Sequence, residues 1–360
     1  MKNLIILLST CLITFASFQS EARVWRLNNQ SGVDADVTTN LQDAVDTASY
    51  GDTIYVEQSP FDYGDAVIAK KLIIIGGGYW LDQNDSTQEN INKSQVFYLV
   101  FNSGSEGSVI SGLYFYTTDG FSGQKFIEIN TNSITIQRCY ITLQNPSNYS
   151  YLIYITGNRT NVIIQQNWLQ FLFGVSQNAP IYINGDPGNL IIRNNICKSH
   201  LNTNGSPGKL IYASTSSSST FVIKNNIFYG NLNTYNALYV NNIMLDGTYS
   251  NSSGGLASNN LCNGTQYPIG NNNQRNLSMS SVFVNYISMI DNGYILSSSS
   301  PAKNVGINGG DCGAFSNDYG GEPYVLSGIP DIPSIFDVNF NATVISTNTI
   351  NVTIKAKSNK

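Results

Sequence analysis

The chain has 360 residues, a formal net charge of −5 and only 11% charged residues, whereas soluble domains average roughly 25%. Its six arginines form no basic stripe, which argues against nucleic acid as a partner, and its single histidine and five cysteines lack metal-ligand spacing. A hydrophobic content of 41% is enough for a sizeable core and excludes a disordered chain.

The first 22 residues, MKNLIILLSTCLITFASFQSEA, have the pattern of a secretory signal. Lys2 precedes an apolar run that ends in small residues, and cleavage would fall before Arg23. A lipoprotein signal that uses Cys11 is the alternative. No later segment reaches the ~20 apolar residues of a membrane-spanning helix. We therefore expect an exported protein without a transmembrane segment, either secreted or held at the cell surface, with the periplasm as a further location.

Early in the chain, residues 41–49 have the pattern of a short helix. The end of a stack of strands needs a cover, so we expect this helix to cap the first strands.

A loose repeat, apolar-x-apolar-x-x-Asn-x-apolar, covers the middle of the chain. Its sixth position advances by 26, 28, 28, 31 and 34 residues through Leu113, Cys139, Asn167, Asn195, Asn226 and Asn260. A period of this length that tolerates insertions is typical of a solenoid. Val, Ile, Thr, Tyr and Asn dominate without a 3.6-residue stripe, which excludes helical repeats. The sequence therefore predicts an all-β solenoid of stacked coils.

The recurrent Asn is expected to be structural. An Asn side chain at the same turn of each coil can bond the amide and backbone of the next coil and can tolerate left-handed φ. Parallel strands lie about 4.8 Å apart, so Cys197 and Cys262, two coils apart, are too distant for a disulfide. With Cys139, they read as small core residues.

A second series of alternating strands interleaves with the first. Its central residues advance by 26, 28, 30 and 27 residues through Glu128, Tyr154, Tyr182, Tyr212 and Tyr239. Apolar neighbours on both sides should point inward, so these central side chains are predicted to point outward. Four tyrosines on consecutive coils would form a stripe about 14 Å long. Such rings suit sugar rings, although stacked aromatic side chains also stabilise a sheet without a ligand.

The end of the chain is rich in turn residues. After SSPAKNVGINGGDCGAF, residues 299–315, a segment with three prolines at 322–336 breaks regular structure. Two alternating runs within residues 338–358 predict a C-terminal β-hairpin that closes the far end of the solenoid. We assign residues 23–320 to the solenoid and residues 321–360 to a proline-containing linker with a C-terminal β segment.

Two motifs carry a family resemblance. LQDAVDTASYGDTIYV (41–56) with KKLIIIGGG (70–78), and residues 299–315, resemble the first and closing coils of pectin-lyase-like right-handed parallel β-helix proteins. The resemblance covers roughly residues 30–320. It implies a right-handed β-helix and a carbohydrate partner, since many members cleave uronate-rich polysaccharides and others only bind or decorate glycans.

An enzyme of that family would need particular residues. The aspartate cluster with histidine that its hydrolases use is absent, because the lone His200 in KSHLNTNG has no Asp-Asp neighbour. A lyase would need an acidic calcium site and a Lys or Arg that takes the α-proton. When the repeats are aligned, Arg193 and Lys224 occupy the same position on successive coils. These two residues are the candidate catalytic pair. The acidic residues that would complete such a site are Glu128, Asp186 and Asp246.

We therefore predict a monomeric β-helix that binds a polysaccharide or cell-surface glycan without catalysis and without a cofactor. The predicted binding residues are Tyr154, Tyr182, Tyr212 and Tyr239. One alternative is a divergent polysaccharide lyase, which would use Ca²⁺. The other is an adhesin-like rod, whose contact face would be the apolar outer row of the first strand series at Thr135, Ile163, Ile191 and Val222.

Overall fold

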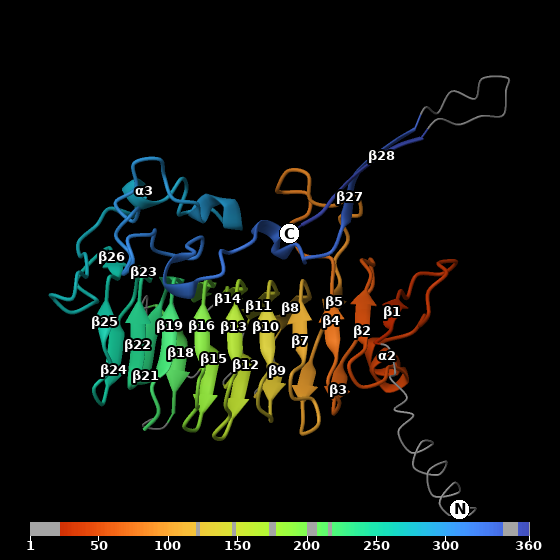
Figure 1. The fold of residues 1–360 in the computed structure, drawn as a ribbon, viewed down its shortest axis with the longest axis horizontal. Coiled ribbons are helices and arrows are strands. Elements are labelled where there is room, and N and C mark those ends of the chain that lie inside the picture. The colour runs from red at the N-terminus through yellow and green to blue at the C-terminus, as the bar shows by residue number, and fades with distance from the viewer. Residues whose placement is uncertain are drawn as a thin grey trace, which may run out of the picture.

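A computed structural model gives the fold of the chain. It describes residues 22–119, 123–145, 149–172, 178–199, 207–214, 218–340 and 352–359. Residues 1–21 of the predicted signal, and His200, lie outside the described residues. Three long sheets of parallel strands run side by side along the molecule (Figure 1).

Each sheet forms one wall of the coil. Sheet A has ten strands: β1 (Val24–Leu27), β2 (Thr53–Val56), β4 (Ile73–Ile75), β7 (Val109–Ser111), β10 (Thr135–Gln137), β13 (Ile163–Gln165), β16 (Ile191–Arg193), β19 (Phe221–Lys224), β22 (Ala237–Val240) and β25 (Ala257–Ser258). Sheet B has eight: β5 (Gln95–Val96), β8 (Tyr114–Asp119), β11 (Tyr140–Asn145), β14 (Trp168–Phe171), β17 (Ile196–Ser199), β20 (Ile227–Tyr229), β23 (Ile243–Asp246) and β26 (Leu261–Cys262). Sheet C also has eight: β3 (Ala66–Ile68), β6 (Leu99–Phe101), β9 (Lys125–Ile129), β12 (Tyr151–Thr156), β15 (Ala179–Asn184), β18 (Lys209–Ala213), β21 (Asn231–Tyr235) and β24 (Tyr249–Ser252).

The path of the chain through the sheets defines the fold. From β10 the chain passes through β11 in sheet B and β12 in sheet C before it returns to sheet A as β13. Neighbouring strands within each of these sheets are parallel. The predicted right-handed parallel β-helix is therefore confirmed.

A column of isoleucines shows how the coils stack. The inward position of sheet A carries the same side chain on seven consecutive strands: Ile54, Ile74, Ile110, Ile136, Ile164, Ile192 and Ile223. All seven are at most 1% exposed. Burial of each side chain contributes about 1.5–3 kcal/mol, so this column is a main source of stability.

The helix α2 (Leu41–Thr47) covers the open end of the first coils, as predicted. Asn40 caps it, because its side chain accepts a hydrogen bond from the Asp43 backbone N–H at 2.9 Å. Leu41, Ala44 and Val45 are buried, and the helix contacts β1, β2 and β3. The helix thus shields the apolar interior at this end from water.

The recurrent Asn residues form a buried ladder at the turn between sheets A and B. The Asn195 side chain accepts from the Asn167 backbone N–H at 3.0 Å and donates to the Ile164 carbonyl at 2.9 Å. Equivalent bonds from backbone N–H to side-chain oxygen connect Cys139, Asn167, Asn195, Asn226, Asn242, Asn260 and Asn273. The residue before each of these seven positions has left-handed φ: Arg138, Gln166, Asn194, Asn225, Asn241, Asn259 and Asn272. The ladder residues themselves do not have left-handed φ.

One coil was not predicted by the repeat. The step of 34 residues from Asn226 to Asn260 contains two short coils of 16 and 18 residues, with Asn242 between them. The 16-residue coil, from Asn226 to Asn242, is short because only one residue separates β20 from β21. A signal was present in the sequence, since the pair Asn241-Asn242 repeats Asn225-Asn226 and Asn259-Asn260.

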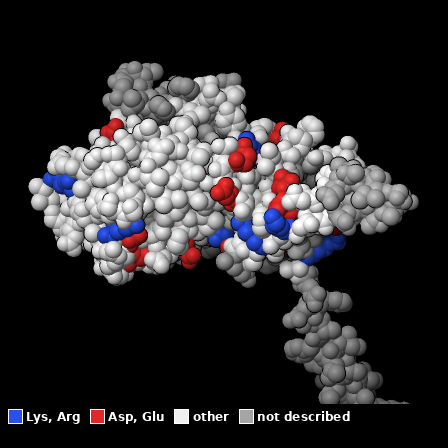
Figure 2. Space-filling model, turned by 90° about the horizontal axis from the view of Figure 1, so that it is seen from above, with Lys and Arg blue, Asp and Glu red and all other residues white. Residues whose placement is uncertain are grey.

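After β26 the chain turns back along the outer face of sheet B (Figure 1). We call residues 277–333 the returning segment; it contains α3 (Met279–Val282) and the 3₁₀ helices η1 (Asp291–Tyr294), η2 (Asp318–Gly320) and η3 (Leu326–Gly328). Residues 299–315 belong to it and contain no strand, so their assignment as a closing coil is wrong. The reason is a second core, in which outer side chains of sheet B such as Trp168 and Ile227 belong to one buried cluster with Val282 and Phe283 of the returning segment. Figure 2 looks down on the side of the molecule where the returning segment lies. Most of the described surface on this side carries neither acidic nor basic side chains.

The C-terminal hairpin exists but lies elsewhere than predicted. Strands β27 (Ser334–Phe340) and β28 (Val352–Lys357) are antiparallel. The Glu89 backbone N–H donates to the Ile335 carbonyl at 2.9 Å, and the Ser334 hydroxyl donates to the Thr87 carbonyl at 3.1 Å. The hairpin is therefore attached beside the first coils and does not close the far end. None of the described helices has the length and apolar character needed to cross a membrane.

Candidate functional site

Sheet C presents one row of outward side chains, one from each coil. In order along the sheet the row is Val67, Val100, Glu128, Tyr154, Tyr182, Tyr212, Asn233 and Ser250. Ile153 and Ile155 on either side of Tyr154 are fully buried, which directs Tyr154 outward. The predicted outward positions of Tyr154, Tyr182 and Tyr212 are confirmed, and each of these side chains is half-buried.

The tyrosine rings contact one another along the row. Tyr154 and Tyr182 are stacked, with ring centroids 5.2 Å apart and an interplanar angle of 5°. Tyr182 and Tyr212 lie 5.5 Å apart at 44°. Tyr151, from the other outward position of β12, lies 4.4 Å from Tyr182. The four rings form a continuous aromatic surface, and each ring contact adds about 0.5–1.5 kcal/mol to the packing.

A lysine lies over each end of the tyrosine row. Lys125 Nζ is 4.3 Å from the centroid of the Tyr154 ring, and Lys209 Nζ is 4.0 Å from that of Tyr212. Both distances are within the range of cation–π attraction. Burial lowers the pKa of Lys209. The face therefore has an aromatic middle with an ammonium donor at each end.

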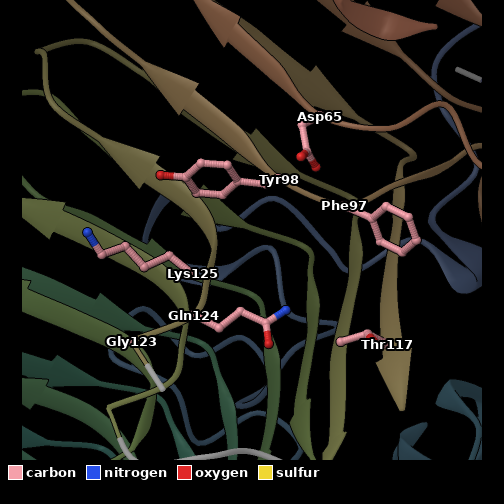
Figure 3. Close-up of a pocket in the computed structure, with 7 residues that line it drawn as sticks. All are labelled: Asp65, Phe97, Tyr98, Thr117, Gly123, Gln124 and Lys125. Atoms are coloured by element: carbon pink, nitrogen blue, oxygen red, sulfur yellow. The ribbon is translucent and has the colours of Figure 1, made fainter. Parts of the chain in front are cut away.

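A pocket of about 530 Å³ continues the face beyond Lys125 (Figure 3). The described residues that line it are Asp65, Phe97, Tyr98, Thr117, Gly123, Gln124 and Lys125. The Tyr98 hydroxyl donates to Glu128 Oε2 at 2.7 Å, and Lys125 Nζ is 2.9 Å from the same oxygen. Burial acts to raise the pKa of Glu128, but these two hydrogen bonds and the charge of Lys125 lower it overall. Glu128 is thus held ionised and acts as an acceptor.

Tyr239 is not part of the row, and its predicted outward position is wrong. It lies on β22 of sheet A, takes the inward position beside Ile223 and is fully buried. Its hydroxyl is 2.9 Å from that of Thr234, inside the coil. The place after Tyr212 is taken by Asn233, because the coil that contains Tyr239 is shorter than the earlier ones.

Arg193 and Lys224 are neighbours in sheet A, as the alignment of the coils predicts. Arg193 donates to the Gly320 carbonyl at 2.7 Å, and Lys224 donates to the Tyr319 carbonyl at 2.6 Å. Burial lowers the pKa of both groups, and for Lys224 the charge of Arg193 lowers it further. Both cations are engaged by main-chain oxygens of the returning segment, which fastens that segment to sheet A.

The acidic residues considered for a lyase site lie on different walls. Glu128 is on sheet C and Asp246 on sheet B, while Asp186 accepts from the backbone N–H groups of Ser218 and Ser219 in the turn between sheets C and A. In the part of the chain that the structure describes, no three His, Cys, Asp or Glu residues are grouped so that they could hold a metal ion.

The outer row of sheet A is partly open. Ile163, Ile191 and Val222 are half-buried and, with Asn161 and Asn189, line a pocket of about 250 Å³. This is the row on which the adhesin-like alternative depends. The sheet B face, in contrast, is covered by the returning segment.

These features define a right-handed parallel β-helix with a half-exposed aromatic row on one wall. No family model matches the sequence, and no curated protein is similar to it. Among solved structures, the chain is similar to pectate lyase Pel9A, with 13% identity, a TM-score of 0.44 and coverage of 82% of this chain and 96% of the other. A pectin methylesterase from Aspergillus niger shows 12% identity and a TM-score of 0.37, with coverage of 78% of this chain and 94% of the other. DFA-IIIase from Arthrobacter chlorophenolicus A6 shows 10% identity and a TM-score of 0.32, with coverage of 72% of this chain and 100% of the other. The fold assignment itself rests on the strand register of this chain.

Proposed function

We propose that the protein is an exported, monomeric glycan-binding protein whose sheet C face holds a polysaccharide chain. The observation that carries the proposal is the row of Tyr154, Tyr182 and Tyr212, half-buried on consecutive coils with centroids 5.2 and 5.5 Å apart. Aromatic rings pack against the apolar faces of sugar rings, and a tyrosine hydroxyl supplies a hydrogen bond at the edge of the contact. Lys125 and Lys209 add donors for sugar oxygens at the two ends.

A role without catalysis is supported by the charged residues. Glu128 is held ionised by Tyr98 and Lys125, so it is poorly suited to donate a proton to a leaving group. Arg193 and Lys224 are bonded to the returning segment. We propose that binding uses no metal ion, and retention of polysaccharide should therefore be unchanged by EDTA.

The tyrosine row is tested by the double variant Tyr182→Ala, Tyr212→Ala in affinity electrophoresis through gels that contain neutral or acidic polysaccharides. Loss of two ring contacts of about 0.5–1.5 kcal/mol each should weaken retention roughly tenfold. The matched control is Tyr50→Ala, because Tyr50 is 69% exposed and lies just after α2, which contacts β3, three strands from the β12 strand of Tyr154. Equal retention of the double variant and the wild type would reject the proposal.

A polysaccharide lyase is the second candidate, favoured by the stacking of Arg193 on Lys224. It is tested with pectic, alginate and glycosaminoglycan substrates, with and without calcium, by ultraviolet absorbance of the unsaturated uronate product. The binding proposal predicts a flat trace. A calcium-dependent rise that Lys224→Ala abolishes would replace binding with lyase activity and move the site to sheet A.

A further inference from the structure

A second pocket, of about 220 Å³, lies between the outer face of sheet B and the returning segment. Its floor is Gln170, Lys198 and Tyr229, which are neighbours on β14, β17 and β20. Tyr286 and Tyr294 of the returning segment form the opposite wall. This pocket is on a different wall of the coil from the tyrosine row of sheet C.

Lys198 is the charged group of this pocket. Its Nζ lies 5.2 Å from the ring centroids of both Trp168 and Tyr294 and donates to the Ser288 carbonyl at 3.3 Å. These contacts place the ammonium group over two aromatic rings, within the range of cation–π attraction. The aromatic surroundings give the pocket an apolar interior with one cation at its floor.

None of the described side chains supplies a carboxylate partner to this cation. Among the described side chains, Lys198 forms no ion pair, and the closest acid in its column, Asp246, lies beyond Tyr229, two strands or about 10 Å away. Of the residues whose side chains lie outside the described part of the chain, only Glu21 and Asp119 are acidic, and Asp119 is on β8, three strands from β17 in sheet B.

A half-buried cation without a counter-ion is costly, because its lost hydration is not replaced by an opposite charge. Burial lowers the pKa of Lys198 to about 8, so the amine still carries its proton at neutral pH. The two rings and one carbonyl offset only part of the lost hydration. An anion that enters the pocket would supply the missing counter-ion for Lys198.

We propose that this pocket binds a small aromatic carboxylate, with its carboxylate on Lys198 Nζ and its ring among Tyr229, Tyr286 and Tyr294. The ring is inferred from the tyrosine walls and from Ile287 and Met289, which are 73% and 54% exposed at the pocket and offer apolar contact. The volume is below the roughly 300 Å³ at which pockets for drug-sized ligands begin, so a single-ring acid is the size that fits.

Methionine methyl groups report directly on this pocket. Of the four methionines in the sequence, Met289 lines the pocket, whereas Met244 and Met279 are buried elsewhere and serve as internal references. With ¹³C-methyl-methionine protein, 4-hydroxybenzoate should produce a saturable NMR shift of Met289 and leave Met244 and Met279 in place. The neutral analogue 4-hydroxybenzamide should bind at least tenfold more weakly.

Lys198→Met should weaken 4-hydroxybenzoate binding at least tenfold, whereas Lys303→Met, which removes a lysine outside the pocket, should not change it. The proposal would be overturned by any of three results. These are equal affinity of the wild type for the acid and the amide, equal affinity of the wild type and Lys198→Met for the acid, and the absence of a saturable Met289 shift at millimolar acid. If Lys198→Met does not fold, the comparison of acid and amide on the wild-type protein still decides.

Discussion

At each turn between sheets A and B, two adjacent residues have different roles. Asn195 points inward and joins the buried ladder. Asn194, with φ of 53°, points outward and donates to the carbonyls of Ala314 and Ser316 at 2.8 and 2.7 Å. Asparagine suits both positions, because its amide bonds to backbone and it tolerates left-handed φ better than most residues. The repeated Asn-Asn pair thus serves the interior and the surface together.

The ladder predicts a clear effect of Asn195→Leu. The change removes the acceptor of the Asn167 backbone N–H and the donors to two carbonyls, all of them in or beside the buried turn. Leaving such groups unpaired costs about 1–3 kcal/mol, so we expect the free energy of unfolding to fall by about 3 kcal/mol in urea denaturation. Asn263→Leu, at an exposed site, is the matched control. An equal midpoint for Asn195→Leu and wild type would show that the ladder is not stabilising.

At the scale of the element, the outward side chains beside the ladder hold the returning segment. Their partners fall in residue number as the coils advance: Arg138 donates to the Ile329 carbonyl, Gln166 to Pro323, Asn225 to Asp318 and Asn259 to Val305. The segment therefore runs back along the β-helix in the direction opposite to the stacking of the coils. Arg193 and Lys224 belong to the same attachment, and Glu322 of the returning segment forms an ion pair with Arg193 at 3.6 Å.

This attachment is tested by Asn194→Gly, which keeps the left-handed backbone but removes the side-chain amide. Hydrogen exchange, followed by mass spectrometry, should become faster in residues 312–324 and stay unchanged in the strands of sheet A. Asn189→Gly removes a left-handed asparagine from an exposed turn and should leave residues 312–324 protected. Uniformly faster exchange throughout the chain would instead indicate global destabilisation.

At the scale of the whole molecule, the protein has two cores that share sheet B. The first fills the coils, and the second lies between the outer face of sheet B and the returning segment. Trp168 and Ile196 in the second core are fully buried. A β-helix without the returning segment would therefore expose a contiguous apolar wall, which is a site of association.

Two truncations separate the contribution of the returning segment from that of the hairpin. Deletion of residues 277–360 should produce protein that binds the dye anilinonaphthalene sulfonate and aggregates, because the sheet B wall is uncovered. Deletion of residues 334–360 removes only β27, β28 and their flanks, and β28 is exposed along its whole length. This shorter deletion should stay soluble with a similar melting temperature. A soluble, dye-negative product of the longer deletion would contradict the role assigned to the second core.

The sequence by itself determined the coil architecture, the capping helix, the buried cysteines and three of the four tyrosine positions. These features depend on period-two alternation and on a turn that recurs in every coil, and both are local properties. Only the tertiary structure decided the path of residues 277–333 and the place of the hairpin, because a segment without periodicity is positioned by the surface that it covers. Tyr239 was misplaced for a related reason: the 34-residue step from Asn226 to Asn260 contains two short coils, so Tyr239 falls on sheet A, and coil length is set by corner loops that carry little sequence pattern. The roles of Arg193, Lys224 and Lys198 likewise depend on contacts with residues about 90 to 130 positions away in the chain, which become neighbours only when the chain turns back on itself.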